Sequence, residues 1–111
     1  GCLARSKGWA MIRPVATIQQ ATARYFDVPV DALSGPARHA RVAMARHIAM
    51  WLVRVHARAS FPEIGRVFGN RDHTTVIYSC DKITQLKSSD PQMGKQLQLI
   101  SDRLHMAQRG R

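Results

Sequence analysis

Apolar residues recur at steps of three and four along most of the chain, a spacing that places side chains on one face of an α-helix. The pattern predicts a first helix that opens at Pro14 and that Pro29 ends. Residues 30–33 suffice for one short helical turn before the Ser34-Gly35-Pro36 break, and a long helix follows over about 42–57. The inward positions of the two long helices are Val15, Ile18, Thr22, Tyr25 and Phe26, and Val42, Ala45, Ile48, Ala49, Leu52 and Val55.

Helix-capping residues divide the second half of the chain into three further helices. Ser60 and Glu63 form a capping box that starts a short helix over 62–68, and Gly69-Asn70 ends it. Asp72 is a good N-cap for a helix over 72–87, and a last helix opens at Asp90-Pro91. The inward positions of these last two helices are Val76, Ile77, Cys80 and Ile83, and Met93, Leu97, Ile100 and Leu104.

No convincing strand pattern occurs, so the fold class expected is all-α, a multi-helix domain with a helix-turn-helix. The domain is predicted to cover residues 14–108. Residues 1–13 follow no usable period and are interpreted as an N-terminal tail, and residues 109–111 as a C-terminal tail. The preferred interpretation of the basic residues in the first tail is a disordered basic tail, and the alternative is an arm that contacts a polyanion.

The two middle helices have the spacing of a helix-turn-helix, in which the second helix enters the major groove of DNA. A capped helix over 62–68, a turn over 69–71 and a helix over 72–87 follow one another. The second helix opens with Asp72, His73, Thr74 and Thr75, whose short polar side chains suit contact with base edges. The alternative is that Asp72 only caps the helix and that the threonines are solvated.

Composition narrows the classes of function. The net charge of +10 predicts attraction to polyanions, and the seven Asp and Glu residues are too scattered for a typical acid–base enzyme. Cys2 and Cys80 make no disulfide framework, so a reduced, cytoplasmic protein is expected. No apolar run approaches the roughly 18 to 20 residues that span a membrane. The histidines do not stand at metal-ligand spacing with cysteine, so neither a metal nor a cofactor is expected.

One long stretch closely resembles the signature of the C-terminal DNA-binding domain of the bacterial DnaA family of replication initiators. It reads Pro62-Glu63-Ile64-Gly65-Arg66-Val67-Phe68-Gly69-Asn70-Arg71-Asp72-His73-Thr74-Thr75-Val76. The resemblance extends over roughly residues 14–105. It implies sequence-specific binding of a monomer to short, asymmetric, AT-rich boxes on duplex DNA, as in recognition of a replication origin or its regulation.

The resemblance also implies roles for single residues. Asp72 to Thr75 would read bases in the major groove, and Pro62 would contact a thymine methyl group. Arg38, or Arg41 if the loop is shifted, would enter the minor groove, which suits arginine where the groove is narrow. Further contacts, mainly to phosphates, fall on the long helix and on Tyr78, which replaces a frequent histidine. The full set of DNA-binding candidates is Arg38, Arg41, Arg46, His47, Arg54, Pro62, Arg71, Asp72, His73, Thr74, Thr75 and Tyr78.

Some features depart from the family. Ala40, Met44 and Asp81 stand where further basic residues are frequent, which affects affinity and box preference more than the binding mode. No G-x-x-x-x-G-K-[ST] motif is present, so the chain has no P-loop for nucleotide. A complete initiator needs an ATPase module, so the chain is expected to be either the C-terminal domain of a longer parent chain or a free-standing relative.

Three alternatives to origin recognition remain open on the sequence. The same module could serve a small transcription regulator or an accessory protein of a mobile element. A helical interaction module could dock an acidic partner on its basic face. The basic long helix could also contact acidic lipids, although its apolar stripe is expected to be buried.

Overall fold

The computed structural model describes the backbone of residues 15–36 and 39–109, and side chains as far as residue 106. All regular structure in these ranges is helical, which confirms the all-α fold class. The elements are a helix over 15–26, η1 (Val30–Leu33), α2 (Ala40–Leu52), η2 (Val53–Ala57), α3 (Phe61–Val67), α4 (His73–Ser89) and α5 (Pro91–Arg109). The predicted N-terminal tail and Arg38 lie outside the described residues.

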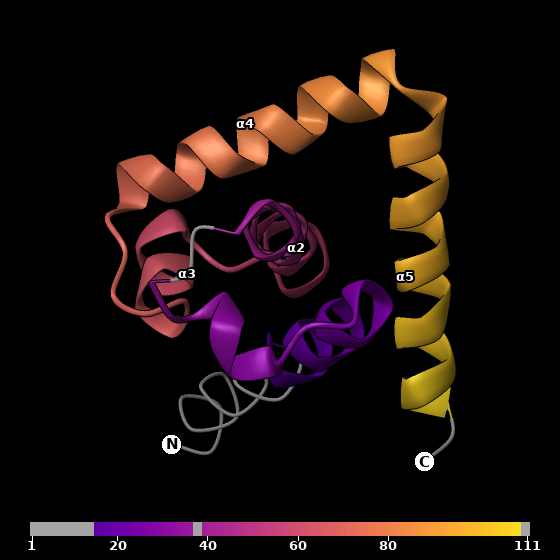
Figure 1. Cartoon of the computed structure of the whole chain (residues 1–111), viewed down its shortest axis with the longest axis horizontal. Coiled ribbons are helices and arrows are strands. Elements are labelled where there is room, and N and C mark those ends of the chain that lie inside the picture. Colours follow the sequence, from indigo (N-terminus) through magenta and orange to yellow (C-terminus); the bar gives the residue numbers. More distant parts are fainter. Residues whose placement is uncertain (1–14, 37–38, 110–111) are drawn as a thin grey trace, which may run out of the picture.

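Helix α2 is the centre of the fold. Figure 1 views it nearly end-on, with α3, α4 and the helix over 15–26 arranged around it and α5 beyond the far end of α4. Apolar side chains from these helices meet in one core, in which Ile48, Leu52, Phe68, Val76 and Ile83 are fully buried. The recognition helix predicted from the sequence, α4, therefore packs directly against the central helix α2.

The predicted long helix over 42–57 is in fact two segments. Helix α2 begins at Ala40 and ends at Leu52, and a π-helical turn, η2, continues the chain to Ala57. A π-turn holds more residues than an α-turn and so rotates the side chains that follow it. Val53 consequently turns into the core, whereas Val55 is 46% exposed. The prediction that Val55 faces inward is wrong for this reason.

The local signals of the helix-turn-helix are confirmed. The Ser60 hydroxyl accepts a hydrogen bond from the Glu63 N–H at 3.3 Å, and the Ser60 N–H donates to the Glu63 carboxylate at 2.9 Å. Gly69 and Asn70 both adopt positive φ, at 87° and 58°, and turn the chain between α3 and α4. These residues set where α3 begins and ends, and hence where α4 can start.

The inward faces of α4 and α5 are mostly as predicted. Val76, Cys80 and Ile83 are buried on α4, whereas Ile77 is only half-buried. Ser79 is buried instead, at 1% exposure, which the apolar pattern did not indicate. On α5 the four predicted positions are all buried: Met93, Leu97, Ile100 and Leu104.

The turn gives a test of the packing. In Gly69→Ala the new Cβ would lie 2.2 Å from the Ser34 carbonyl oxygen, at a φ of 87° that alanine rarely adopts. We expect this variant to lose on the order of 2 kcal/mol or more of unfolding free energy in urea denaturation. Gly94→Ala is the matched control, because a Cβ added at Gly94 would have no neighbour within 4 Å and the site is helical. It should gain about 0.5–1 kcal/mol. Equal midpoints for the two variants would contradict the close approach.

Candidate nucleic-acid interface

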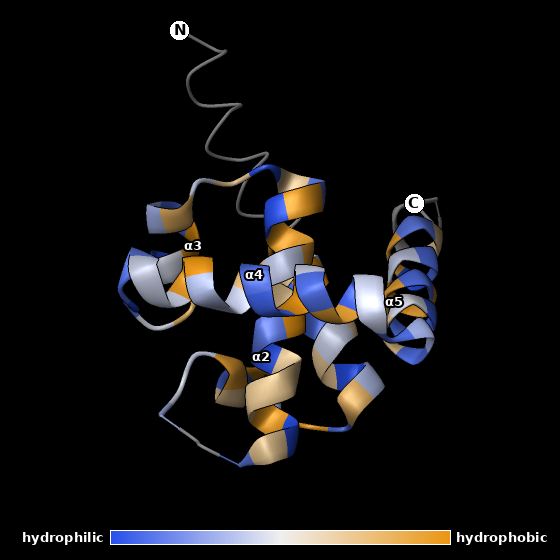
Figure 2. Ribbon diagram, turned by 90° about the horizontal axis from the view of Figure 1, so that it is seen from above, coloured by the Kyte–Doolittle hydropathy of each residue, from blue (hydrophilic) through white to orange (hydrophobic). Residues whose placement is uncertain are grey.

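The first turn of α4 is exposed to solvent. Asp72, His73, Thr74 and Thr75 are all exposed, and Tyr78, one turn further along, is 60% exposed. Tyr78 follows Thr75 by three residues, so the two side chains share a helix face. Figure 2 looks down onto α4, which shows mainly hydrophilic to neutral colours on this side. The structure thus brings the predicted base-reading residues together on one open polar surface.

Asp72 caps α4. Its Oδ1 accepts a hydrogen bond from the Thr74 N–H at 3.2 Å and lies 3.2 Å from Nδ1 of His73. Hydrogen bonds from the backbone and side chain of Thr74 lower the pKa of Asp72, so the carboxylate is charged at neutral pH. The predicted capping role is confirmed. Base reading by Asp72 remains a prediction.

Arg46 points into the protein, with only 8% of its surface exposed. Its guanidinium donates hydrogen bonds to the carbonyl oxygens of Leu33 at 3.0 Å, Ala32 at 3.2 Å and Gly35 at 3.2 Å. Burial and, secondarily, the charge of Arg71 lower the pKa of Arg46. These carbonyls hold the Arg46 side chain inside the protein. This geometry does not favour its predicted phosphate contact.

Arg71 meets Arg46 at the same carbonyl. It donates to the Gly35 oxygen at 2.7 Å and also to the Phe68 carbonyl. The two arginines therefore tie the segment before α2 to the turn of the helix-turn-helix. The predicted place of Arg71 among the DNA-binding residues stays untested, but its guanidinium already holds the turn.

The remaining candidates are placed at the surface. Arg41 and Pro62 are exposed, at the start of α2 and in the first turn of α3. Arg54 is also exposed, but its guanidinium donates to the Ala59 carbonyl at 2.9 Å and lies 4.1 Å from the ring centre of Phe61. Arg54 therefore holds the loop after η2, and its positively charged side chain remains exposed to solvent.

His47 joins α2 to α4. Its Nδ1 lies 2.7 Å from the hydroxyl oxygen of Ser79, and its ring meets the ring of Tyr78 edge-on, with centres 6.2 Å apart. The ammonium nitrogen of Lys82 lies over the Tyr78 ring, 5.9 Å from the ring centre. Burial, followed by the charges of Lys82, Arg46 and Arg71, lowers the pKa of His47. Sequence reasoning missed Ser79, whose signal was a polar residue at an inward position of α4.

The other groups offer little for catalysis or metal binding. Burial raises the pKa of the Cys80 thiol to about 11, so it is protonated at neutral pH and a poor nucleophile. No group of His, Cys, Asp and Glu residues that could hold a metal occurs within the described part of the chain. None of the described helices is long and apolar enough to cross a membrane.

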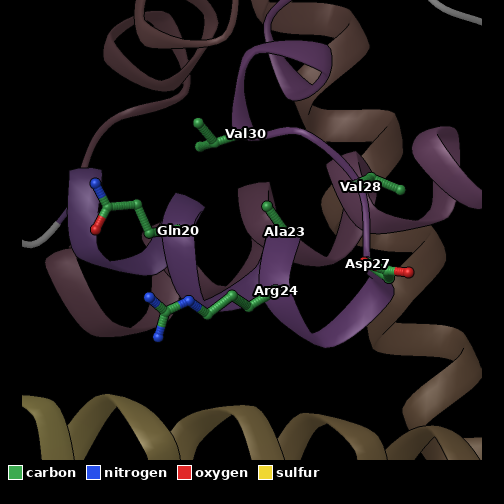
Figure 3. A pocket seen from close by; sticks show the side chains of 6 residues that line it. All are labelled: Gln20, Ala23, Arg24, Asp27, Val28 and Val30. Carbon is green, nitrogen blue, oxygen red and sulfur yellow. The ribbon is translucent and has the colours of Figure 1, made fainter.

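A depression lies away from α4, between the helix over 15–26 and η1. Its lining residues are Gln20, Ala23, Arg24, Asp27, Val28 and Val30. Figure 3 shows that the polar side chains of Gln20, Arg24 and Asp27 extend in different directions and do not converge on one point. It gathers no set of groups that would hold a small ligand.

A short capped helix, a tight turn and a second helix with an exposed polar start are typical of DNA-binding helix-turn-helix domains. The comparisons with known proteins agree. The family model described as "Bacterial dnaA protein helix-turn-helix" matches residues 15–83. The chain therefore belongs to the bacterial DnaA helix-turn-helix family, and it is a DNA-binding domain and not an enzyme.

Individual relatives show the same relation. The chain is 48% identical over 92 residues to the chromosomal replication initiator protein DnaA of Nostoc punctiforme, and the alignment covers 83% of this chain. It is 44% identical over 90 residues to the protein of that name from Levilactobacillus brevis, with 81% of this chain covered. In both cases the chain spans about one fifth, 20%, of the relative's length.

The inward position of Arg46 leads to a prediction about stability. Arg46→Met would leave the carbonyl oxygens of Leu33, Ala32 and Gly35 without these donors. We expect a loss of about 2–4 kcal/mol in the free energy of unfolding, measured by thermal or urea denaturation. Arg66→Met is the matched control, since Arg66 is exposed on α3, and should stay within about 0.5 kcal/mol of the wild type. If the two variants have the same free energy of unfolding, the internal role of Arg46 is refuted.

Proposed function

We propose that this domain binds a short AT-rich box of the DnaA type as a monomer and reads it through both grooves. The observation that carries the proposal is the exposed run from Asp72 to Thr75 at the start of α4. The opposite face of α4 is fixed in the core by Val76, Cys80 and Ile83. A helix held in this way can enter the major groove as a rigid unit, with its first residues against the base edges.

Arg38 is the first candidate for a contact in the minor groove. In the sequence it stands between Gly35, whose carbonyl accepts a hydrogen bond from Arg71, and Ala40, where α2 begins. An arginine suits the narrow minor groove of AT-rich DNA. Arg41 is the second candidate for this contact.

Cationic and polar groups around the reading helix would bind phosphates. Arg41 and Arg54 are exposed on the α2 side, and Tyr78 and Lys82 follow the exposed face of α4. The N–H groups at the start of α4 add a partial positive charge toward a phosphate. Such contacts set position and orientation, whereas sequence is read by Thr74, Thr75 and their neighbours.

The relatives are named as chromosomal replication initiators, and this chain spans only a part of them. We infer that it serves recognition of a replication origin, or its regulation, at the nucleoid in the cytoplasm. Opening of the origin would need an ATPase module from a longer parent chain or from a partner.

The central test is a fluorescence-anisotropy titration at about physiological salt. One labelled duplex carries an AT-rich initiator-type box and the other carries the same bases scrambled. We expect a preference of tenfold or more for the box, which corresponds to about 1.4 kcal/mol. Equal affinity for both duplexes would refute specific reading, and no binding to either would refute DNA binding by this domain alone.

Two single variants separate reading from phosphate binding. Thr75→Ala should cost about 1–3 kcal/mol on the box and leave binding to the scrambled duplex almost unchanged. Arg41→Ala should weaken binding to both duplexes and reduce the slope of log K against log salt by about 0.9. Identical behaviour of the two variants in titrations over a range of salt would show that the roles are not divided in this way.

Asp72 can be tested for its two roles separately. Asp72→Ser keeps an oxygen that can cap the Thr74 N–H, so stability should change by less than about 0.5 kcal/mol. It removes the carboxylate that would accept from a cytosine amino group, so affinity for the box should fall by about 1 kcal/mol or more. Asp72→Ala, the control without a cap, should lose about 1 kcal/mol of stability as well. Full box affinity in Asp72→Ser would leave capping as the sole role of Asp72.

A further inference from the structure

One side-chain hydrogen bond joins the central helix to the recognition helix beside the proposed DNA surface. His47 on α2 and Ser79 on α4 meet at 2.7 Å, through Nδ1 and the hydroxyl oxygen. Ser79 is 1% exposed and lies under the helix surface, whereas the ring of His47 is half-buried. The ring meets Tyr78, which shares the exposed face of α4 with Thr75.

The position of the Ser79 hydrogen decides which tautomer His47 adopts. Other hydroxyls in these helices donate to the carbonyl one turn earlier, as Thr22 does to Ile18 at 2.8 Å and Thr84 to Cys80 at 2.9 Å. Among the described residues, the Ser79 hydroxyl has His47 Nδ1 as its hydrogen-bond partner and no such carbonyl. Because a buried hydroxyl needs an acceptor for its hydrogen, this geometry favours donation from Ser79 to Nδ1. A neutral ring that accepts at Nδ1 carries its own hydrogen on Nε2.

The surroundings also disfavour a second proton on the ring. Protonation would place an N–H at Nδ1 against the Ser79 hydroxyl and leave the buried hydroxyl hydrogen without an acceptor. The groups that face the ring are Tyr78 and Lys82 from α4, Arg46 from α2 and Arg71 from the turn. Burial and the three cations lower the pKa of His47 below its usual value. The imidazole is therefore neutral at pH 7.

We propose that Ser79 is a positioning residue for DNA binding, which holds His47 as a neutral imidazole whose Nε2–H donates to a phosphate of the bound duplex. The proposal rests on the proposed function, because the acceptor is DNA. No hydrogen bond of Nε2 is found among the described residues, and the half-buried ring meets the exposed ring of Tyr78 edge-on. The contact uses the N–H of a neutral ring, so it does not need a proton to be taken up near neutral pH.

The tautomer can be measured without DNA. Nitrogen-15 NMR of the imidazole side chains, with the His47 signal assigned by its loss in His47→Gln, should show a neutral ring with hydrogen on Nε2 at pH 7. In Ser79→Ala the two tautomers should mix and the ring should protonate at higher pH. A wild-type His47 that is charged at pH 7, or that carries its hydrogen on Nδ1, would overturn the proposal.

The phosphate contact needs a second measurement, with box and scrambled duplexes. Ser79→Ala should weaken binding to both by a similar factor, about three- to tenfold, because a phosphate contact carries little sequence information. In a His47→Ala background, Ser79→Ala should weaken binding no further, since it acts through the ring. Circular dichroism at the titration temperature checks that each variant is folded.

The outcomes separate this inference from the proposed function. If the wild type binds neither duplex, DNA binding and this contact both fail. If the wild type binds DNA and the Ser79→Ala variant binds it equally well, the positioning role alone is refuted. The same holds if Ser79→Ala weakens binding by the same factor in the wild type and in the His47→Ala background.

Discussion

The carbonyl group of Gly35 connects the central helix α2 with the turn of the helix-turn-helix. Arg46 from the central helix and Arg71 from the helix-turn-helix turn both donate hydrogen bonds to its oxygen. Gathering two cations at one point is unfavourable, and the additional carbonyls of Ala32, Leu33 and Phe68 offset that repulsion. The arrangement ties Gly35 and the central helix α2 to the turn that follows α3.

The position of α4 also depends on close packing at the turn that precedes it. Gly65 and Gly69 let the turn approach closely, since a Cβ at either would lie 2.2 Å from a backbone oxygen. The inner face of α4 is then buried on α2, and the outer face is left polar. A helix backbone held in this way would lose little conformational entropy on binding.

The parts of the fold that local chemistry decides could be predicted from the sequence. Ser60 and Asp72 cap their helices as expected, because a cap involves residues only a few positions apart. Arg46, Val55 and Ser79 could not be placed by pattern alone. Val55 depends on a π-turn that changes the helical phase, and Arg46 on carbonyls that only the folded chain brings near. Residues that bind DNA and residues that hold the fold can both be arginines, and helical spacing does not distinguish them.

The way in which Arg46 and Arg71 are bound has a consequence for how DNA would be approached. A carbonyl group has no net charge, so a hydrogen bond to its oxygen orients a guanidinium without cancelling the positive charge. These cations therefore still contribute to the electric field outside the protein within a Debye length of about 8 Å at physiological salt. They can raise the rate at which a duplex encounters the domain without contacting it. Structural arginines would then set the speed of association, while the exposed side chains of α4 set how long the complex lasts.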